Sequence, residues 1–227
     1  LFENLLANAQ PDDEALTNLV SDILKKREDA KLSKGEILWG ALTSYGKYGK
    51  NSAYTNILSS VELKNLKSAE LISVIKDVTA YQHRVLYYGN NSIEEVTSML
   101  NKLHSTPAVI KSTPMAVKYQ ELEENTNVFA VDYDMKQAEV IFISKDEKYN
   151  RMSAPDIRLF NEYFGGGMSS IVFQEMRESK ALAYSVYCSY SNPRKKSEYN
   201  YVFAYIGTQA DKLPEAMKGM MELINNM

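Results

Sequence analysis

The 227-residue sequence holds only two histidines, His83 and His104, and one cysteine, Cys188. Neither histidine has another His three or four residues away, and neither lies in an H-x-x-E-H or H-E-x-x-H spacing. A catalytic zinc ion normally takes three protein ligands and keeps one position open. We therefore expect no metal site within this chain. We expect His83 at the start of a strand and His104 at the end of a helix, both as structural or surface residues.

An excess of basic charge and long apolar runs are also lacking. The 26 basic and 29 acidic residues give a net charge of -3, so the chain lacks the basic surplus typical of nucleic-acid binding. No apolar run approaches the roughly 18 residues that a membrane span requires. A single cysteine excludes an internal disulfide and leaves the redox compartment undecided.

The two ends of the sequence suggest a fragment of a longer protein. The chain begins at Leu1 without a methionine and stops at Met227 inside a helical pattern. No signal peptide is visible, but an upstream segment would be missing from a fragment. The localisation therefore stays open, and a periplasmic or other extracytoplasmic location requires such an upstream signal.

The first half of the chain is mostly helical in its periodicity. Apolar residues recur at helical spacing in three stretches, which predicts helices over 14–30, 34–48 and 68–80. Residues 84–89 are β-branched and aromatic and end in glycine, which predicts a strand. Ser92 and Glu95 form a capping box that opens a further helix.

The second half is richer in strands. Residues 106–126 contain prolines and acidic residues, which indicates a linker. Beyond the linker, the pattern predicts strands over 128–132, 138–144, 182–190 and 199–207, with helices that start near 153, 169 and 211. This order predicts an α+β fold in which helices cover a largely antiparallel sheet.

Three consecutive glycines, Gly165, Gly166 and Gly167, separate two of the predicted helices. One interpretation is a phosphate-binding loop. A P-loop needs G-x-x-x-x-G-K-[ST], however, and a dinucleotide site needs G-x-G-x-x-G after a strand. Here the glycines follow a helix, and no lysine precedes Ser169. The pattern favours a tight structural turn that needs positive φ.

Two further patterns each have a functional and a structural interpretation. Ser169 and Ser170 lack a G-x-S-x-G elbow, and no histidine follows them as a base, so helix capping is favoured over nucleophilic catalysis. The tyrosine-rich strands could stack on single-stranded nucleic acid. The acidic net charge favours their packing in the sheet.

Arg177 and Tyr184 form the remaining candidate site. Arg177 lies near the end of a predicted helix and Tyr184 at the start of the next strand. The short reversal between them can bring a guanidinium and a phenol to one edge of the sheet, where both donate hydrogen bonds to a carbonyl or oxyanion. Chemistry alone favours the alternative, a surface ion pair and a core tyrosine.

At these residues the sequence resembles a known family. The run Gly-Gly-x-x-Ser-Ser, followed by Arg-Glu-x-x-x-Leu-Ala-Tyr and ending at Tyr184, is similar to the C-terminal signature of pitrilysin/insulinase-type zinc peptidases, the inverzincins. Mitochondrial processing peptidase belongs to the same superfamily. The seven-residue step from Arg177 to Tyr184 matches the family's substrate-binding pair. The chain departs from the family at Ile171, Val172 and Ala181, where Arg, Leu and often Gly are found.

The resemblance implies a division of domains. Residues 1–105 would be the latter part of the third of four homologous domains, 106–126 the interdomain linker, and 127–227 the opening part of a truncated fourth domain. The H-x-x-E-H motif and its zinc would lie in the missing N-terminal half. This chain would then hold no catalytic residue or cofactor and would be inactive alone.

The resemblance also implies a function. Arg177 and Tyr184 would bind a peptide or unfolded protein substrate for a zinc metalloendopeptidase, together with the N-terminal half of the same protein. Two alternatives stay open: a non-catalytic binding or scaffolding homologue of the same family, and an unrelated ligand-binding α+β domain.

Overall fold

The computed structural model describes residues 2–122, 126–191, 193 and 195–226. They form two compact units, each assembled from two stretches of sequence. Unit 1 comprises Leu1–Asp29 and Ile57–Lys118, and unit 2 comprises Ala30–Asn56 and Tyr119–Met227. The predicted division into homologous domains, with its linker at 106–126, stays a prediction, because compactness does not test homology.

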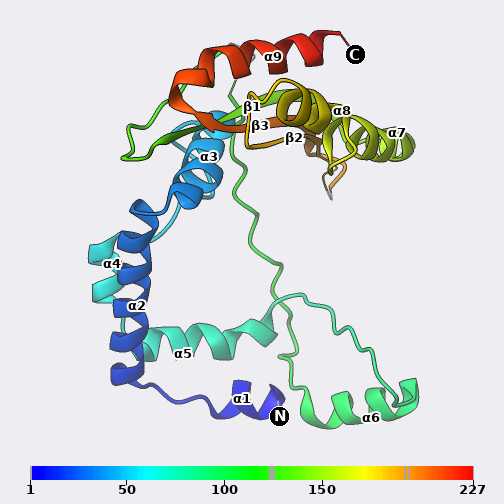
Figure 1. The fold of residues 1–227 in the computed structure, drawn as a ribbon. Coiled ribbons are helices and arrows are strands. Elements are labelled where there is room, and N and C mark those ends of the chain that lie inside the picture. Colours follow the sequence, from blue (N-terminus) through cyan, green and yellow to red (C-terminus); the bar gives the residue numbers. More distant parts are fainter. Residues whose placement is uncertain (1, 123–125, 192, 194, 227) are drawn as a thin grey trace. The chain divides into compact units, whose positions relative to one another are not determined.

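Unit 1 is helical (Figure 1). The capping box that opens one of its helices is confirmed: Ser92 Oγ accepts a hydrogen bond from Glu95 N, and Glu95 Oε2 accepts one from Ser92 N. The helices predicted over 14–30 and 68–80 are also confirmed. The helices of this region are α1 (Phe2–Asn8), α2 (Asp13–Lys31), α4 (Ser60–Asn65), α5 (Ser68–Asp77), the short 3-10 turn η2 (Val78–Ala80) and α6 (Ile93–Leu103).

Two of the predicted strands are wrong. Residues 84–89 and 128–132 belong to no sheet. The nearest pairing is a single parallel bridge between Tyr81 and Lys111, in which Lys111 N donates to the Ala80 carbonyl. High β-propensity favours extended backbone, but a strand also needs a partner for its ladder of hydrogen bonds. His83 therefore lies in irregular chain rather than at a strand start, whereas His104 directly follows α6 as expected.

Unit 2 is built on a three-stranded antiparallel sheet in the order β1-β3-β2. Its strands are β1 (Gln137–Lys148), β2 (Ser185–Tyr190) and β3 (Tyr199–Gln209). They confirm the strands predicted over 138–144 and 199–207 and most of the one predicted over 182–190, and with them the α+β class. Tyr205 of β3 lies opposite Ile141 of β1 and Tyr187 of β2, so these three side chains share one face.

Helices cover both faces of this sheet. Figure 1 shows α9 (Leu213–Asn225) on one face and α3 (Thr43–Tyr48) on the other. The segment that leads into α3 is the π-helix η1 (Glu36–Leu42), which confirms the helix predicted over 34–48. On its face, Trp39 stacks on Tyr187 with ring centroids 6.1 Å apart and meets Tyr205 at 5.5 Å. Tyr187 and Tyr205 therefore pack against Trp39 on the sheet, the interpretation that the acidic net charge favoured.

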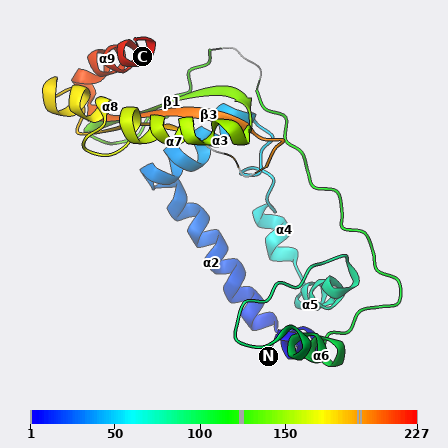
Figure 2. The same cartoon turned by 90° about the vertical axis from the view of Figure 1, so that its right-hand side faces the viewer.

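The opposite face of the sheet holds the main core. Its fully buried members include Val172, Met176, Ile206 and Met220. Figure 2 shows α7 (Ala154–Phe160) and α8 (Ile171–Phe173) along this sheet. The remaining short elements are η3 (Arg151–Ser153), η4 (Asn161–Gly165), η5 (Gln174–Ser179) and η6 (Ala210–Lys212).

The three glycines lie at the end of η4 and in the turn that leads to α8, and only part of this turn needs positive φ. Gly167 has a φ of +78°. Gly165 instead lies against β2: a Cβ there would be only 1.8 Å from the Cys188 carbonyl oxygen. A Cβ on Gly166 would be 2.7 Å from the Asn161 carbonyl oxygen. Gly165 and Gly166 are therefore required because other backbone atoms lie too close for a Cβ.

These different reasons predict different costs of substitution. Gly165→Ala should lower the free energy of unfolding by about 3 kcal/mol or more, because its methyl group overlaps a backbone carbonyl. Gly167→Ala should cost only about 1 kcal/mol, since open space surrounds it and only the backbone conformation is strained. Urea unfolding of both variants measures the difference. Equal losses would contradict the close approach of Gly165 to β2.

Burial of Cys188 predicts a pH dependence of stability. The thiol faces the core at 1% exposure, and burial raises its pKa from an ordinary 9.0 to about 11. Because the folded pKa is raised, the stabilising contribution is complete below pH 9 and is lost as the pH rises toward 11. The free energy of unfolding should therefore fall in this window less steeply for Cys188→Ala than for the natural chain. Urea titrations at successive pH values test this, and parallel curves would contradict it.

Candidate functional site

A short helix at the face of the sheet carries Arg177. It begins at α8, where Ser170 Oγ accepts from Phe173 N at 3.3 Å and donates to the Gly167 carbonyl at 2.9 Å. This confirms the capping role expected for one of the two serines. The helix continues as η5, and its inner side is fixed in the core because Val172 and Met176 are fully buried.

A tight reversal then leads from the helix to β2. The Met176 carbonyl accepts hydrogen bonds from Leu182 N at 2.8 Å and Ala183 N at 3.3 Å. Ala181 within this reversal has a φ of +50°, the only non-glycine positive φ among the described residues. Tyr184 N then donates to the Gly207 carbonyl of β3 at 2.9 Å. Backbone hydrogen bonds therefore fix the positions of the residues on both sides of the turn.

Arg177 and Tyr184 meet at the surface of unit 2. The guanidinium carbon of Arg177 lies 5.1 Å from the centre of the Tyr184 ring and 4.9 Å from that of Phe173. Both distances are within the range of cation–π attraction, about 0.5–1 kcal/mol at exposed sites. The structure therefore brings the two predicted residues together, with Phe173 as a third member.

The exposure of the two side chains bears on the alternative interpretation, a surface ion pair and a core tyrosine. Tyr184 is 73% exposed, so the interpretation as a core tyrosine is wrong. The predicted ion pair does exist, with Arg177 Nε 3.6 Å from Glu178 Oε1, but both side chains are exposed. Such a pair contributes at most about 1 kcal/mol to stability. The Tyr184 side chain is therefore largely open to solvent, and that of Arg177 is half-exposed.

The sequence analysis did not identify two residues near the pair. Phe173 precedes Arg177 by four residues in a helix, a spacing that places side chains on the same side and could have identified it. Lys212 of η6 reaches the reversal from beyond β3, where Lys212 Nζ donates to the Ala181 carbonyl at 3.2 Å. No local pattern in the sequence indicates that contact.

The described residues contain no group of three or more His, Cys, Asp or Glu side chains that could hold a metal ion. In the same part of the chain, no helix has the length and apolarity needed to cross a membrane.

Comparison with known sequences identifies the family. A family model described as "Peptidase M16 inactive domain" matches residues 82–227, which include β1–β3 and the Arg177/Tyr184 pair. The chain therefore belongs to the M16 peptidase family, and the resemblance to zinc peptidases of the pitrilysin/insulinase type is confirmed. A curated relative, the uncharacterized zinc protease YmxG of Bacillus subtilis, is 24% identical over 208 residues, which cover 91% of this chain and 48% of YmxG.

Solved structures show the same fold. A peptidase M16 inactive domain from Pseudomonas fluorescens aligns with 99% of this chain and 55% of its own, with a TM-score of 0.69 at 16% identity. A mutant of the ferredoxin protease FusC, in complex with Arabidopsis ferredoxin, covers 100% of this chain and 25% of its own, with a TM-score of 0.66 at 13% identity. A protease from Helicobacter pylori gives a TM-score of 0.64 at 13% identity, over 97% of this chain and 55% of its own. The chain thus spans about half or less of the length of these relatives.

The exposure of the pair predicts that it contributes little to stability. Tyr184→Phe should change the free energy of unfolding by less than about 0.5 kcal/mol, because the side chain is 73% exposed. Arg177→Gln should cost about 1 kcal/mol, because the half-exposed guanidinium loses its contacts with two aromatic rings. The neighbouring buried residue gives the contrast: Met176→Ala should cost about 3 kcal/mol, since it leaves a cavity in the core. Thermal or urea unfolding measures all three. A loss for Tyr184→Phe comparable to that for Met176→Ala would show a structural role.

Proposed function

We propose that this chain is the C-terminal, substrate-binding portion of a zinc metalloendopeptidase that cleaves peptides or unfolded proteins. The observation that carries the proposal is the exposed Arg177/Tyr184 pair, with guanidinium and ring 5.1 Å apart. The membership of the M16 family supports it, as does the zinc protease named among the relatives.

The chemistry of the pair suits a peptide backbone. A guanidinium presents five N–H donors, and a phenol adds one O–H. Both recognise carbonyl oxygens, which every residue of a polypeptide offers, so the recognition does not depend on the substrate sequence. An extended or unfolded chain exposes these carbonyls, whereas helices and sheets already pair them. The proposed substrates are therefore unfolded segments.

The pair would also contribute to the reaction itself. Zinc, which the N-terminal half would hold, would supply a Lewis acid and an activated water when bound. Peptide hydrolysis develops negative charge on the carbonyl oxygen of the scissile bond. Arg177 and Tyr184 would donate hydrogen bonds to that oxygen and to the neighbouring backbone. Their anchoring to the core keeps this donor pair oriented before the substrate arrives.

The proposal predicts a selective loss of turnover. In the full-length protein, Tyr184→Phe should lower kcat/KM for peptide cleavage by on the order of 10²-fold, because one donor to the developing charge is lost. Bound zinc and thermal stability should remain unchanged, since Tyr184 is exposed. Peptide cleavage, metal content and thermal unfolding are measured on the same preparations.

A matched control separates this role from a general effect of losing a surface hydroxyl. Tyr163 of η4 is similarly exposed, at 67%, and lies outside the pair, so Tyr163→Phe should leave cleavage unchanged. Equal activity of Tyr184→Phe and the natural protein would refute the assigned role. A full-length protein that binds unfolded peptide but lacks zinc and cleavage would instead identify a non-catalytic homologue.

A further inference from the structure

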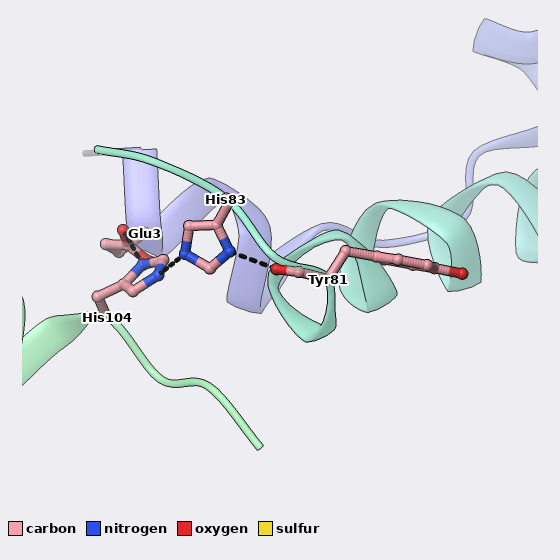
Figure 3. Close-up of polar contacts among 4 residues, drawn as sticks. All are labelled: Glu3, Tyr81, His83 and His104. Atoms are coloured by element: carbon pink, nitrogen blue, oxygen red, sulfur yellow. Dashed lines mark hydrogen bonds and ion pairs between the residues drawn. The ribbon is translucent and has the colours of Figure 1, made fainter. Parts of the chain in front are cut away.

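The two histidines, far apart in the sequence, meet in unit 1. His83 Nε2 lies 2.8 Å from His104 Nε2, although the two residues are 21 positions apart in the sequence (Figure 3). His83 comes shortly after η2, and His104 directly follows α6. Glu3 of α1 adds a third segment, because its Oε1 lies 2.7 Å from His104 Nδ1. Three segments of unit 1 thus converge on one small polar cluster.

The outer partners determine which ring nitrogens carry hydrogen. His83 Nδ1 lies 2.6 Å from the Tyr81 carbonyl oxygen, which only accepts hydrogen bonds, so this Nδ1 is the donor. A carboxylate oxygen of Glu3 likewise accepts, so His104 Nδ1 is also a donor. In neutral rings both Nε2 atoms then present lone pairs. Two lone pairs that face each other at 2.8 Å repel unless a cation lies between them.

We propose that His83 and His104 form a two-histidine site for a divalent transition-metal ion such as Zn²⁺. The site is formed by residues of unit 1 and goes beyond the proposed peptidase function. Imidazole nitrogen is a preferred ligand of zinc, copper and nickel. Metal-binding histidines usually donate their other ring N–H to a carboxylate or a backbone carbonyl, and Glu3 and Tyr81 supply one of each.

The geometry requires only a small adjustment. Tetrahedral zinc with bonds of about 2.0–2.1 Å places two nitrogen ligands roughly 3.3 Å apart. The Nε2 atoms need to separate by about half an ångström from their present 2.8 Å. His83 is exposed, so its ring has room to move. Glu3 is held on the far side of the His104 ring and orients that ring without binding the ion.

The site differs from a closed structural zinc centre, which has four protein ligands. Two histidines leave two positions for water, so binding is reversible and weaker than at such a centre. Its effect is to link His83 to the end of α6 and, through Glu3, to α1. The sequence analysis predicted no metal site, because the two histidines are far apart in the sequence. Ligand spacing along the chain reveals only sites whose ligands are close in sequence.

The test is a Zn²⁺ titration of the intact protein by isothermal calorimetry. The natural protein should bind one ion per chain more than the double variant His83→Gln/His104→Gln. Each single histidine substitution should weaken this additional binding at least tenfold. Glu3→Gln should weaken it by about tenfold, the lower range for loss of an orienting partner. The matched control is Gln82→Ala, an exposed neighbour of His83 that should bind as the natural protein does.

A second measurement distinguishes a metal ion from the rival cation, a shared proton. Zn²⁺ should raise the melting temperature of the natural protein but not that of the double variant. In ¹⁵N spectra, the Nε2 signals of both histidines should shift on addition of Zn²⁺. Identical titrations of the natural protein and the double variant would overturn the proposal, as would Nε2 signals that Zn²⁺ leaves unchanged. Neither readout involves peptidase activity, so failure of the proposed function leaves this test intact.

Discussion

The candidate site depends on the anchoring of Met176 in the core of unit 2. Its side chain is fully buried, and a Cβ on Gly219 of α9 would be only 3.2 Å from its sulfur. Its carbonyl accepts the two N–H groups that close the turn, from Leu182 and Ala183. One residue therefore fixes both the helix and the reversal. Arg177, the next residue, is half-exposed, and Tyr184, which directly precedes β2, lies against its guanidinium.

The sequence predicted the elements of unit 2 well because their local and tertiary requirements agree. The strands that became β1 and β3 combine alternation with partners on the sheet, and Ser170 caps its helix as short-range chemistry requires. The strands predicted over 84–89 and 128–132 were wrong, because the composition of these residues favours extended backbone but no neighbouring strand pairs with them. The glycine turn lies between these cases: that it is a turn was predictable, but the close approach of Gly165 to the Cys188 carbonyl involves a residue far along the chain.

The two clusters of functional interest differ in how far sequence could reveal them. Arg177 and Tyr184 are separated by one short reversal, so a fixed spacing carries the information and a family resemblance can be read from it. Physical chemistry alone did not favour the pair, because it could not give the exposure of Tyr184. His83 and His104 belong to the ends of different segments, and Glu3 to a third. Contacts of that kind arise only from the tertiary fold.

Ala181 shows how the turn between the pair is held. Its φ of +50° is unfavourable for a side chain with a Cβ, at a cost of about 1 kcal/mol, and glycine would remove that cost. Strain of this kind persists only where the surroundings over-determine the backbone. Here they do: hydrogen bonds to the Met176 carbonyl close the turn, and Lys212 donates to the carbonyl of Ala181 itself. The turn that sets the separation of Arg177 and Tyr184 is therefore fixed by the core rather than by its own residue preferences. Such a turn would suit the proposed donor pair, whose geometry would have to be held before a substrate binds.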